Sequence, residues 1–137
     1  MAILPGNTDV AWVVAQFPHL LERALRSHSV RYPRLRLRVA MHYEPLSAGG
    51  EFGPVGSAPI VASRLLDARA TKAALAAEPG HDLVLVISRK LFEEVVATRV
   101  HGLEPRRFRQ MRATIKGVTY HGYLCLGTPR VLVRPRE

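Results

Sequence analysis

Apolar residues recur at helical spacing over residues 10–25, directly after two residues of the kind that begin helices. Thr8 and Asp9 carry side-chain oxygens that can accept hydrogen bonds from the free N–H groups of a first helical turn. This pattern predicts a helix that begins after Asp9. Pro18 falls inside the run, so we expect it either to kink one long helix or to start a second one.

Residues 34–43 alternate strictly between polar and apolar side chains, which is the pattern of a strand with one buried face. Alternation places Arg34, Arg36 and Arg38 together on one face of that strand. The other face carries the remaining side chains of the run, Leu35, Leu37, Val39, Met41 and Tyr43. We therefore expect a half-buried strand with a row of arginines on its polar side.

The remaining elements follow from apolar runs and from the positions of glycine and proline. They are a loop over 44–56, a helix from Pro59 to Ala77, a strand over 83–87, a helix capped by Ser88, and two strands over 108–115 and 118–126 that meet at Lys116-Gly117. The run 83–87 is continuously apolar, as in strands buried on both faces. With a short strand stub at 2–4, this order predicts an α/β sandwich with a mixed sheet.

Length and composition fit one globular domain, because the chain has 137 residues, of which 47% are apolar and 23% charged. We place the folded domain at residues 1–126 and a basic tail at 127–137. The N-terminus lacks the features of a secretory signal, and no apolar run reaches the roughly 20 residues that span a bilayer. The single cysteine, Cys125, rules out an intrachain disulfide, and its apolar surroundings predict a buried small side chain. We expect a cytoplasmic protein.

The net charge of +9 raises the question of nucleic-acid binding. The positive charge comes mainly from arginine, with clusters near residues 34–38, 106–112 and 130–136. No aromatic residues alternate with these arginines in the manner of a platform for stacked bases. We therefore expect a solvated basic surface, or one that meets an acidic partner, rather than a nucleic-acid interface.

Motifs for metal binding and for common hydrolytic chemistry are missing. The six histidines show no His-x-x-x-His spacing, no Cys-x-x-Cys pair occurs, and no Gly-x-Ser-x-Gly elbow is present. The run Gly53-Pro-Val-Gly56 lacks the Gly-Lys-Ser/Thr ending of a P-loop. Glu93 and Glu94 would face different directions on a helix, so we interpret them as part of a solvated face. No metal ion or cofactor is expected.

One segment, Gly56-Ser-Ala-Pro-Ile-Val-Ala-Ser-Arg-Leu65, resembles the signature of class III adenylate/guanylate cyclases, Gly-x-x-Val-Asn-x-x-Ala/Ser-Arg-Leu. Residues 35–43 look like the strand that precedes this signature in the family, and residues 83–88 look like the strand that follows it. Residues 108–124 look like the closing hairpin. The resemblance covers about residues 1–126 and is strongest to divergent, arginine-rich cyclase-like domains of actinobacterial type. It implies a ferredoxin-like, nucleotidyl cyclase-like sheet that lacks the family's first strands.

The resemblance also implies which chemistry is missing. The family's two metal-binding aspartates would precede Met1, and Asp9 is better interpreted as a helix cap. The ribose-orienting Asn corresponds to Ile60, and the base-selecting Asp corresponds to Gly53. The phosphate-binding Arg is retained as Arg64 and the motif glycine as Gly56. Arg64 could bind phosphate, or it could form an ion pair with Asp67 or Glu51.

Together these observations favour a non-catalytic cyclase-like domain that serves interaction or regulation. Because class III domains work as dimers, we expect a homodimer or a partner cyclase-like domain. An open sheet edge would also favour association. Two alternatives stay open, namely a subunit that completes a cyclase site with a partner domain and a nucleotide-binding or nucleic-acid-binding module. Whether Met1 is the natural start also stays open.

Overall fold

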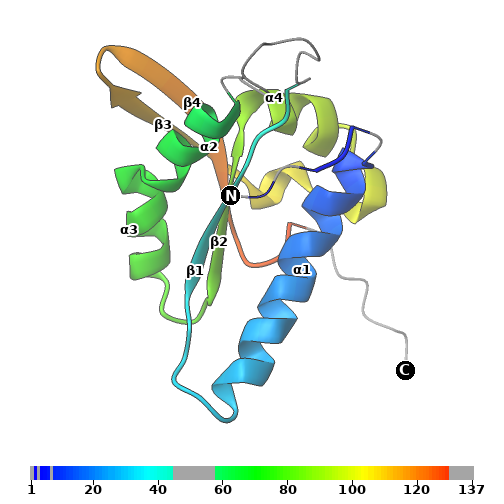
Figure 1. Ribbon diagram of the computed structural model, residues 1–137, viewed down its shortest axis with the longest axis vertical. Coiled ribbons are helices and arrows are strands. Elements are labelled where there is room, and N and C mark those ends of the chain that lie inside the picture. The colour runs from blue at the N-terminus through cyan, green and yellow to red at the C-terminus, as the bar shows by residue number, and fades with distance from the viewer. Residues whose placement is uncertain (1, 3, 7, 45–57, 130–137) are drawn as a thin grey trace.

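A computed structural model of the chain describes residues 2, 4–6, 8–44 and 58–129 (Figure 1). The helices and strands, in chain order, are α1 (Val10–Ser29), β1 (Leu37–Met41), α2 (Ala58–Leu66), α3 (Arg69–Ala77), β2 (Leu83–Ser88), α4 (Arg89–Leu91), β3 (Arg109–Ile115) and β4 (Val118–Leu126). Helix α4 continues as a π-helical turn over Phe92–Val96, and short 3-10 turns cover Val100–Gly102 and Pro105–Arg107.

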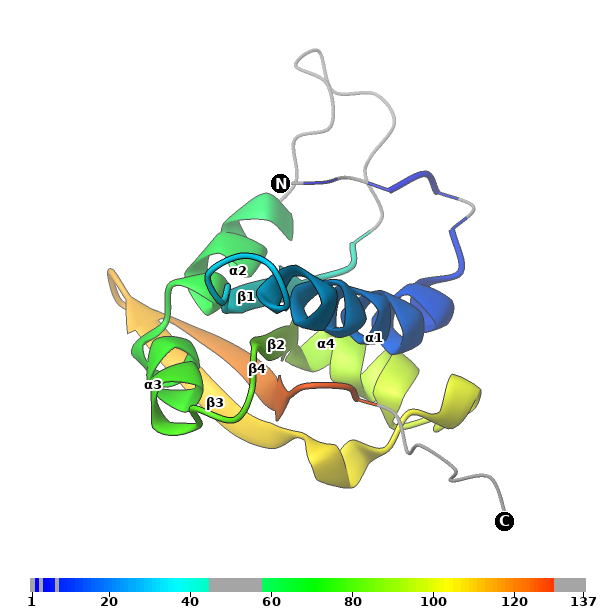
Figure 2. The ribbon, with the colours of Figure 1, turned by 90° about the horizontal axis from the view of Figure 1, so that it is seen from below.

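The four strands form one open, mixed sheet in the order β1-β2-β4-β3. Strands β1 and β2 are parallel, whereas β4 is antiparallel to both of its neighbours. Helices α2 and α3 cover one face of the sheet, and α1 and α4 cover the other (Figures 1 and 2). The expected α/β class and mixed sheet are therefore confirmed.

Strand β2 is the centre of the core, and all six of its residues are buried. Leu85 and Ile87 pack with residues of α1 and α4, whereas Val84 and Val86 pack with residues of α2 and α3. Apolar side chains on both faces are what a strand needs when helices cover both sides. The continuous apolar run therefore predicted this strand correctly.

Helix α1 is one uninterrupted element with Pro18 inside it. Asp9 caps its N-terminus by accepting a hydrogen bond from the backbone N–H of Trp12 at 3.1 Å, as the sequence predicted. Pro18 itself is buried. Of the two outcomes expected for Pro18, the single helix is therefore the one observed.

The helix expected from Pro59 to Ala77 is wrong in one respect, because it is two helices, α2 and α3, separated at Ala68. Ala68 has an extended backbone, with φ −61° and ψ 143°. The hydroxyl of Thr71 donates to the backbone carbonyl of Leu65 at 2.7 Å, which satisfies an acceptor near the end of α2. No glycine or proline marks this break in the sequence.

The hairpin of β3 and β4 turns at Lys116 and Gly117, both with positive φ, as the sequence predicted. The packed structure continues beyond the expected domain boundary at 126. Thr128 and Pro129 are buried, and the backbone N–H of Glu104 donates to the carbonyl of Pro129 at 3.1 Å. At the other end, Ala2 and Leu4 belong to no strand. Among the described helices, none is both long and apolar enough to cross a membrane.

Candidate functional site

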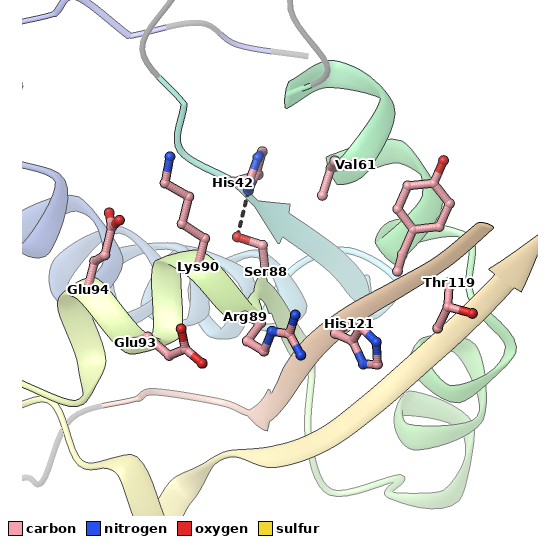
Figure 3. A pocket seen from close by; sticks show the side chains of 10 residues that line it. His42, Val61, Ser88, Arg89, Lys90, Glu93, Glu94, Thr119 and His121 are labelled. Atoms are coloured by element: carbon pink, nitrogen blue, oxygen red, sulfur yellow. Dashed lines mark hydrogen bonds between the residues drawn. The ribbon is translucent and has the colours of Figure 1, made fainter.

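A surface cavity of about 370 Å³ lies beyond the carboxyl ends of the parallel strands β1 and β2 (Figure 3). This is the edge at which open α/β sheets usually bind ligands. His42 follows β1, Ser88 ends β2, and Val61 contributes from α2. The charged residues of the lining come mainly from the helix after β2 and from β4, and they are Arg89, Lys90, Glu93, Glu94 and His121.

His42 and Ser88 form a hydrogen-bonded pair at the base of this cavity. The Nδ1 atom of His42 lies 2.6 Å from the Ser88 hydroxyl oxygen, and the His42 side chain is 5% exposed. The Nε2 atom lies 3.0 Å from Oε1 of Glu44, without the alignment of a hydrogen bond. The hydroxyl of Ser88, the imidazole of His42 and the carboxylate of Glu44 therefore lie in a row.

The geometry of Ser88 is that of a structural residue rather than a nucleophile. Its hydroxyl also accepts a hydrogen bond from the backbone N–H of Leu91 and so caps α4. Its backbone, at φ −67° and ψ 156°, is ordinary extended chain, unlike the strained elbow that exposes a catalytic serine. Ser88 is also only 3% exposed. The pairing with His42 was not predicted from the sequence, although both residues stand at the ends of strands that are parallel neighbours.

Glu93 and Glu94 lie on the π-helical turn, and both line the cavity. Figure 3 shows their carboxylates pointing in different directions. Both side chains are exposed, as expected of a solvated face. Within the described part of the chain, no group of three or more metal-ligating side chains occurs.

A second cavity of about 460 Å³ lies beside the first, on the face of β3 and β4 that α4 leaves uncovered. Arg89 and His121 line both cavities. Gln110, Arg112 and Tyr123 complete the polar part of the second lining. Among the described residues that line this second cavity, none is acidic, so its charge is purely positive.

The signature positions named from the sequence are only partly described. Gly53 and Gly56 lie outside the described residues. Ile60 is on α2 and 53% exposed, and Arg64 is half-buried in the last turn of the same helix. Among the described side chains of α2, Val61 lines the cavity, and Arg64 lies about one helical turn beyond it.

The ion pair expected between Arg64 and Asp67 is not formed. Asp67 instead lies 3.9 Å from a guanidinium nitrogen of Arg38 on β1. Within the described ranges, Arg64 has no ion-pair partner. Glu51, the other expected partner, lies outside the described residues.

The strand expected over 34–43 is shorter in the structure, because β1 covers only Leu37–Met41, and Arg34 and Arg36 precede it. All three arginines of the expected row are bound by the chain itself. Arg34 donates to Asp82 and to the carbonyl of Pro79. Arg36 donates to the carbonyls of Leu75, Glu78 and His81, the last two at 2.8 and 3.1 Å. Arg38, the one arginine of the three within β1, lies 3.9 Å from Asp67. These arginines therefore hold the fold together instead of forming a free basic surface.

Cys125 is buried, with 2% of its surface exposed, as predicted. Burial raises the pKa of its thiol from the ordinary value of 9.0 to about 12, because the thiolate would lose its hydration; the charge of Arg107 lowers this pKa and that of Glu22 raises it. A thiol in this setting is inert at neutral pH.

Comparisons with protein-family models, with curated proteins and with solved structures find no match to this chain.

Proposed function

We propose that this chain is a non-catalytic domain of nucleotidyl cyclase-like type that acts by pairing with a second copy along β1. The order of elements supports the resemblance, since a strand, the signature helix, a parallel strand and a closing antiparallel hairpin follow one another as the family pattern implies. The signature positions that would orient a nucleotide hold Ile60 and Gly53. Interaction therefore accounts for the domain better than catalysis.

The observation that carries this proposal is the contrast between the two edges of the sheet. The β3 edge displays Arg109, Arg112 and other exposed polar side chains, which is how edges are protected from pairing. The β1 edge carries less charge, because Arg38 is the one charged residue of this strand and it lies 3.9 Å from Asp67. Its apolar residues Leu37, Val39 and Met41 are only half-buried.

An apolar flank of α1 extends this edge. Phe17 and Leu20 are 46% and 49% exposed. Glu22, on the opposite flank, is turned toward Gly127 beyond β4. Phe17 lies about 140° around α1 from Glu22, so in the proposed dimer we assign Phe17 to the β1 side of this helix.

A second copy suits this surface because an antiparallel pair of identical strands is self-complementary. A twofold axis at Val39 would place Leu37 opposite Met41 and Arg38 opposite Ala40, so that no two arginines meet. Strand β1 pairs in parallel with β2, and the backbone N–H of Leu37 points toward β2, where it donates to the backbone carbonyl of Asp82. The N–H groups of Arg38 and Ala40 therefore point outward, available to a second strand.

Sedimentation velocity at tens of micromolar, in the µM–mM range where exposed edges associate, tests the proposal. Wild type should be a dimer, and association should strengthen with salt because both copies carry a net charge of +9. Phe17→Lys and Ala40→Pro should each give monomers. Trp12→Lys is the matched control, because Trp12 is 48% exposed on α1 but lies about 140° around the helix from Phe17. A folded wild-type monomer would contradict the proposal.

One observation favours a second candidate, a subunit that lends Arg64 to a partner cyclase domain. Arg64 has no ion-pair partner within the described ranges, and a partly exposed arginine in that state could serve a shared site. The two candidates differ in a direct assay. Cyclase activity that appears when a partner domain is added, and disappears with Arg64→Ala, would establish the second.

A further inference from the structure

Two arginines and a histidine converge beside α4. Arg112 on β3 and His121 on β4 stand directly opposite each other in the strand register. Arg89, the first residue of α4, lines the same cavity of about 460 Å³. Figure 3 shows Arg89 and His121 on the same side of the sheet, at the boundary with the first cavity.

The two guanidinium groups of this cavity, Arg89 and Arg112, have no carboxylate among the described residues that line it. Arg34, Arg36 and Arg38 show how this chain treats arginines that serve its own fold, namely by giving each a carbonyl or carboxylate. Arg89 and Arg112 differ, because the described lining of their cavity offers them no carboxylate partner.

The floor of the cavity is held in place. The ring of Tyr123 stacks on Phe92 with centroids 3.7 Å apart and an interplanar angle of 7°. The amide of Gln110 donates to the Tyr123 hydroxyl at 3.0 Å. A fixed phenol and amide beside two guanidinium groups make a surface rich in hydrogen-bond donors, which suits the oxygens of an anion.

We propose that Arg89, Arg112 and His121 form a binding site for a doubly charged oxyanion, the phosphate group of a small ligand. Arginine suits this group because its planar fork donates two parallel hydrogen bonds to phosphate oxygens. The adjoining cavity of about 370 Å³ has room for the uncharged part of a phosphate ester. The site lies on the far side of the sheet from the β1 edge and does not depend on the proposed dimer.

Charge at His121 adds a pH dependence. The charged groups around it are Arg112 on β3, Arg89 and Lys90 on α4, Glu93 and Glu94 on the π-helical turn, and His42 after β1. Protonated imidazole strengthens anion binding, so affinity should rise as the solution becomes more acidic. Sulfate is the suitable probe for this dependence, because it stays doubly charged across the whole range in which histidine titrates.

The test is titration of sulfate, inorganic phosphate and glycerol phosphate at constant ionic strength, followed by calorimetry or amide chemical shifts. Arg89→Gln and Arg112→Gln should each weaken binding at least about tenfold, as loss of a charge-assisted hydrogen bond implies. His121→Gln should remove the pH dependence of sulfate binding. Arg109→Gln is the matched control, because Arg109 is exposed on the same strand and removes the same charge, but it lies on the opposite face.

The outcomes separate cleanly. Equal affinity for phosphate and glycerol phosphate identifies the free ion as ligand, and tighter binding of glycerol phosphate identifies an ester. Absence of saturable binding, or equal weakening by Arg109→Gln and Arg112→Gln, would overturn the proposal. Sedimentation of Arg112→Gln should match wild type, so failure here is distinguishable from failure of the β1 dimer.

Discussion

The guanidinium of Arg36, the residue before β1, donates to the backbone carbonyl of Leu75 in the last turn of α3. The same side chain reaches the carbonyls of Glu78 and His81, so one arginine satisfies three acceptors where α3 ends and the chain turns toward β2. The last carbonyls of a helix have no partner within it, and a cation there also meets the negative end of the helix dipole. Arg36 therefore joins β1 to α3.

Replacing Arg36 should consequently destabilise the fold. We expect Arg36→Ala to lower the free energy of unfolding by about 2 kcal/mol, because hydrogen bonds to a charged donor contribute about 1.5–3 kcal/mol. Arg38→Ala should cost well under 1 kcal/mol, since its contact with Asp67 is long and partly exposed. Urea denaturation of both variants measures the difference. Equal costs would show that Arg36 serves a surface role instead.

Gly122 on β4 should not tolerate a side chain. A Cβ atom there would lie 2.9 Å from the carbonyl oxygen of Ile87 and 2.9 Å from Cδ2 of Leu65. Because a β-sheet carbonyl cannot move aside, Gly122→Ala should cost about 1–3 kcal/mol, the usual range for overpacking. Gly80→Ala is the control, since nothing lies within 4 Å of its Cβ position. A melting temperature of Gly122→Ala equal to that of Gly80→Ala would refute this account.

Cys125 should make stability fall at alkaline pH. Its pKa is raised to about 12 in the folded chain from an ordinary value of 9.0, so the unfolded chain loses the thiol proton first. Stability from this group is therefore complete below about pH 9 and declines as pH rises toward 12. The difference in unfolding free energy between wild type and Cys125→Ala should shrink across that window. Rapid alkylation of the folded protein at pH 8 would contradict the burial on which this rests.

We expect no cyclic nucleotide from ATP, GTP, CTP or UTP with magnesium or manganese. The resemblance implies two metal-binding aspartates, and neither corresponds to a residue of this sequence, while Ile60 cannot hydrogen-bond a ribose. Product measured by chromatography is the readout. Turnover that Arg64→Ala abolishes would prove this expectation wrong.

Arg64 itself should prove dispensable for nucleotide binding. It lies in the last turn of α2, where a cation gains a few tenths of a kcal/mol from the helix dipole, so Arg64→Ala should change stability by less than about 1 kcal/mol. Titration of nucleotides into wild type and Arg64→Ala should give the same result. The binding of inorganic phosphate beside Arg112 should also be unchanged in this variant. Micromolar nucleotide affinity that depends on Arg64 would reverse our interpretation.

The sequence by itself determined the elements whose pattern is local. The apolar run of β2, the Asp9 cap of α1 and the Lys116-Gly117 turn were all predicted correctly. Each of these depends on residues within one helical turn or one strand, so the chain around them is sufficient to specify them.

The tertiary structure alone decided which distant residues meet. The break between α2 and α3, the contact of Asp67 with Arg38, the pairing of His42 with Ser88 and the opposition of Arg112 to His121 have no local signature. His42 and Ser88 are 46 residues apart in the chain. Whether such residues meet depends on the order and register of the strands, which packing of the whole core fixes and which periodicity along one segment cannot encode.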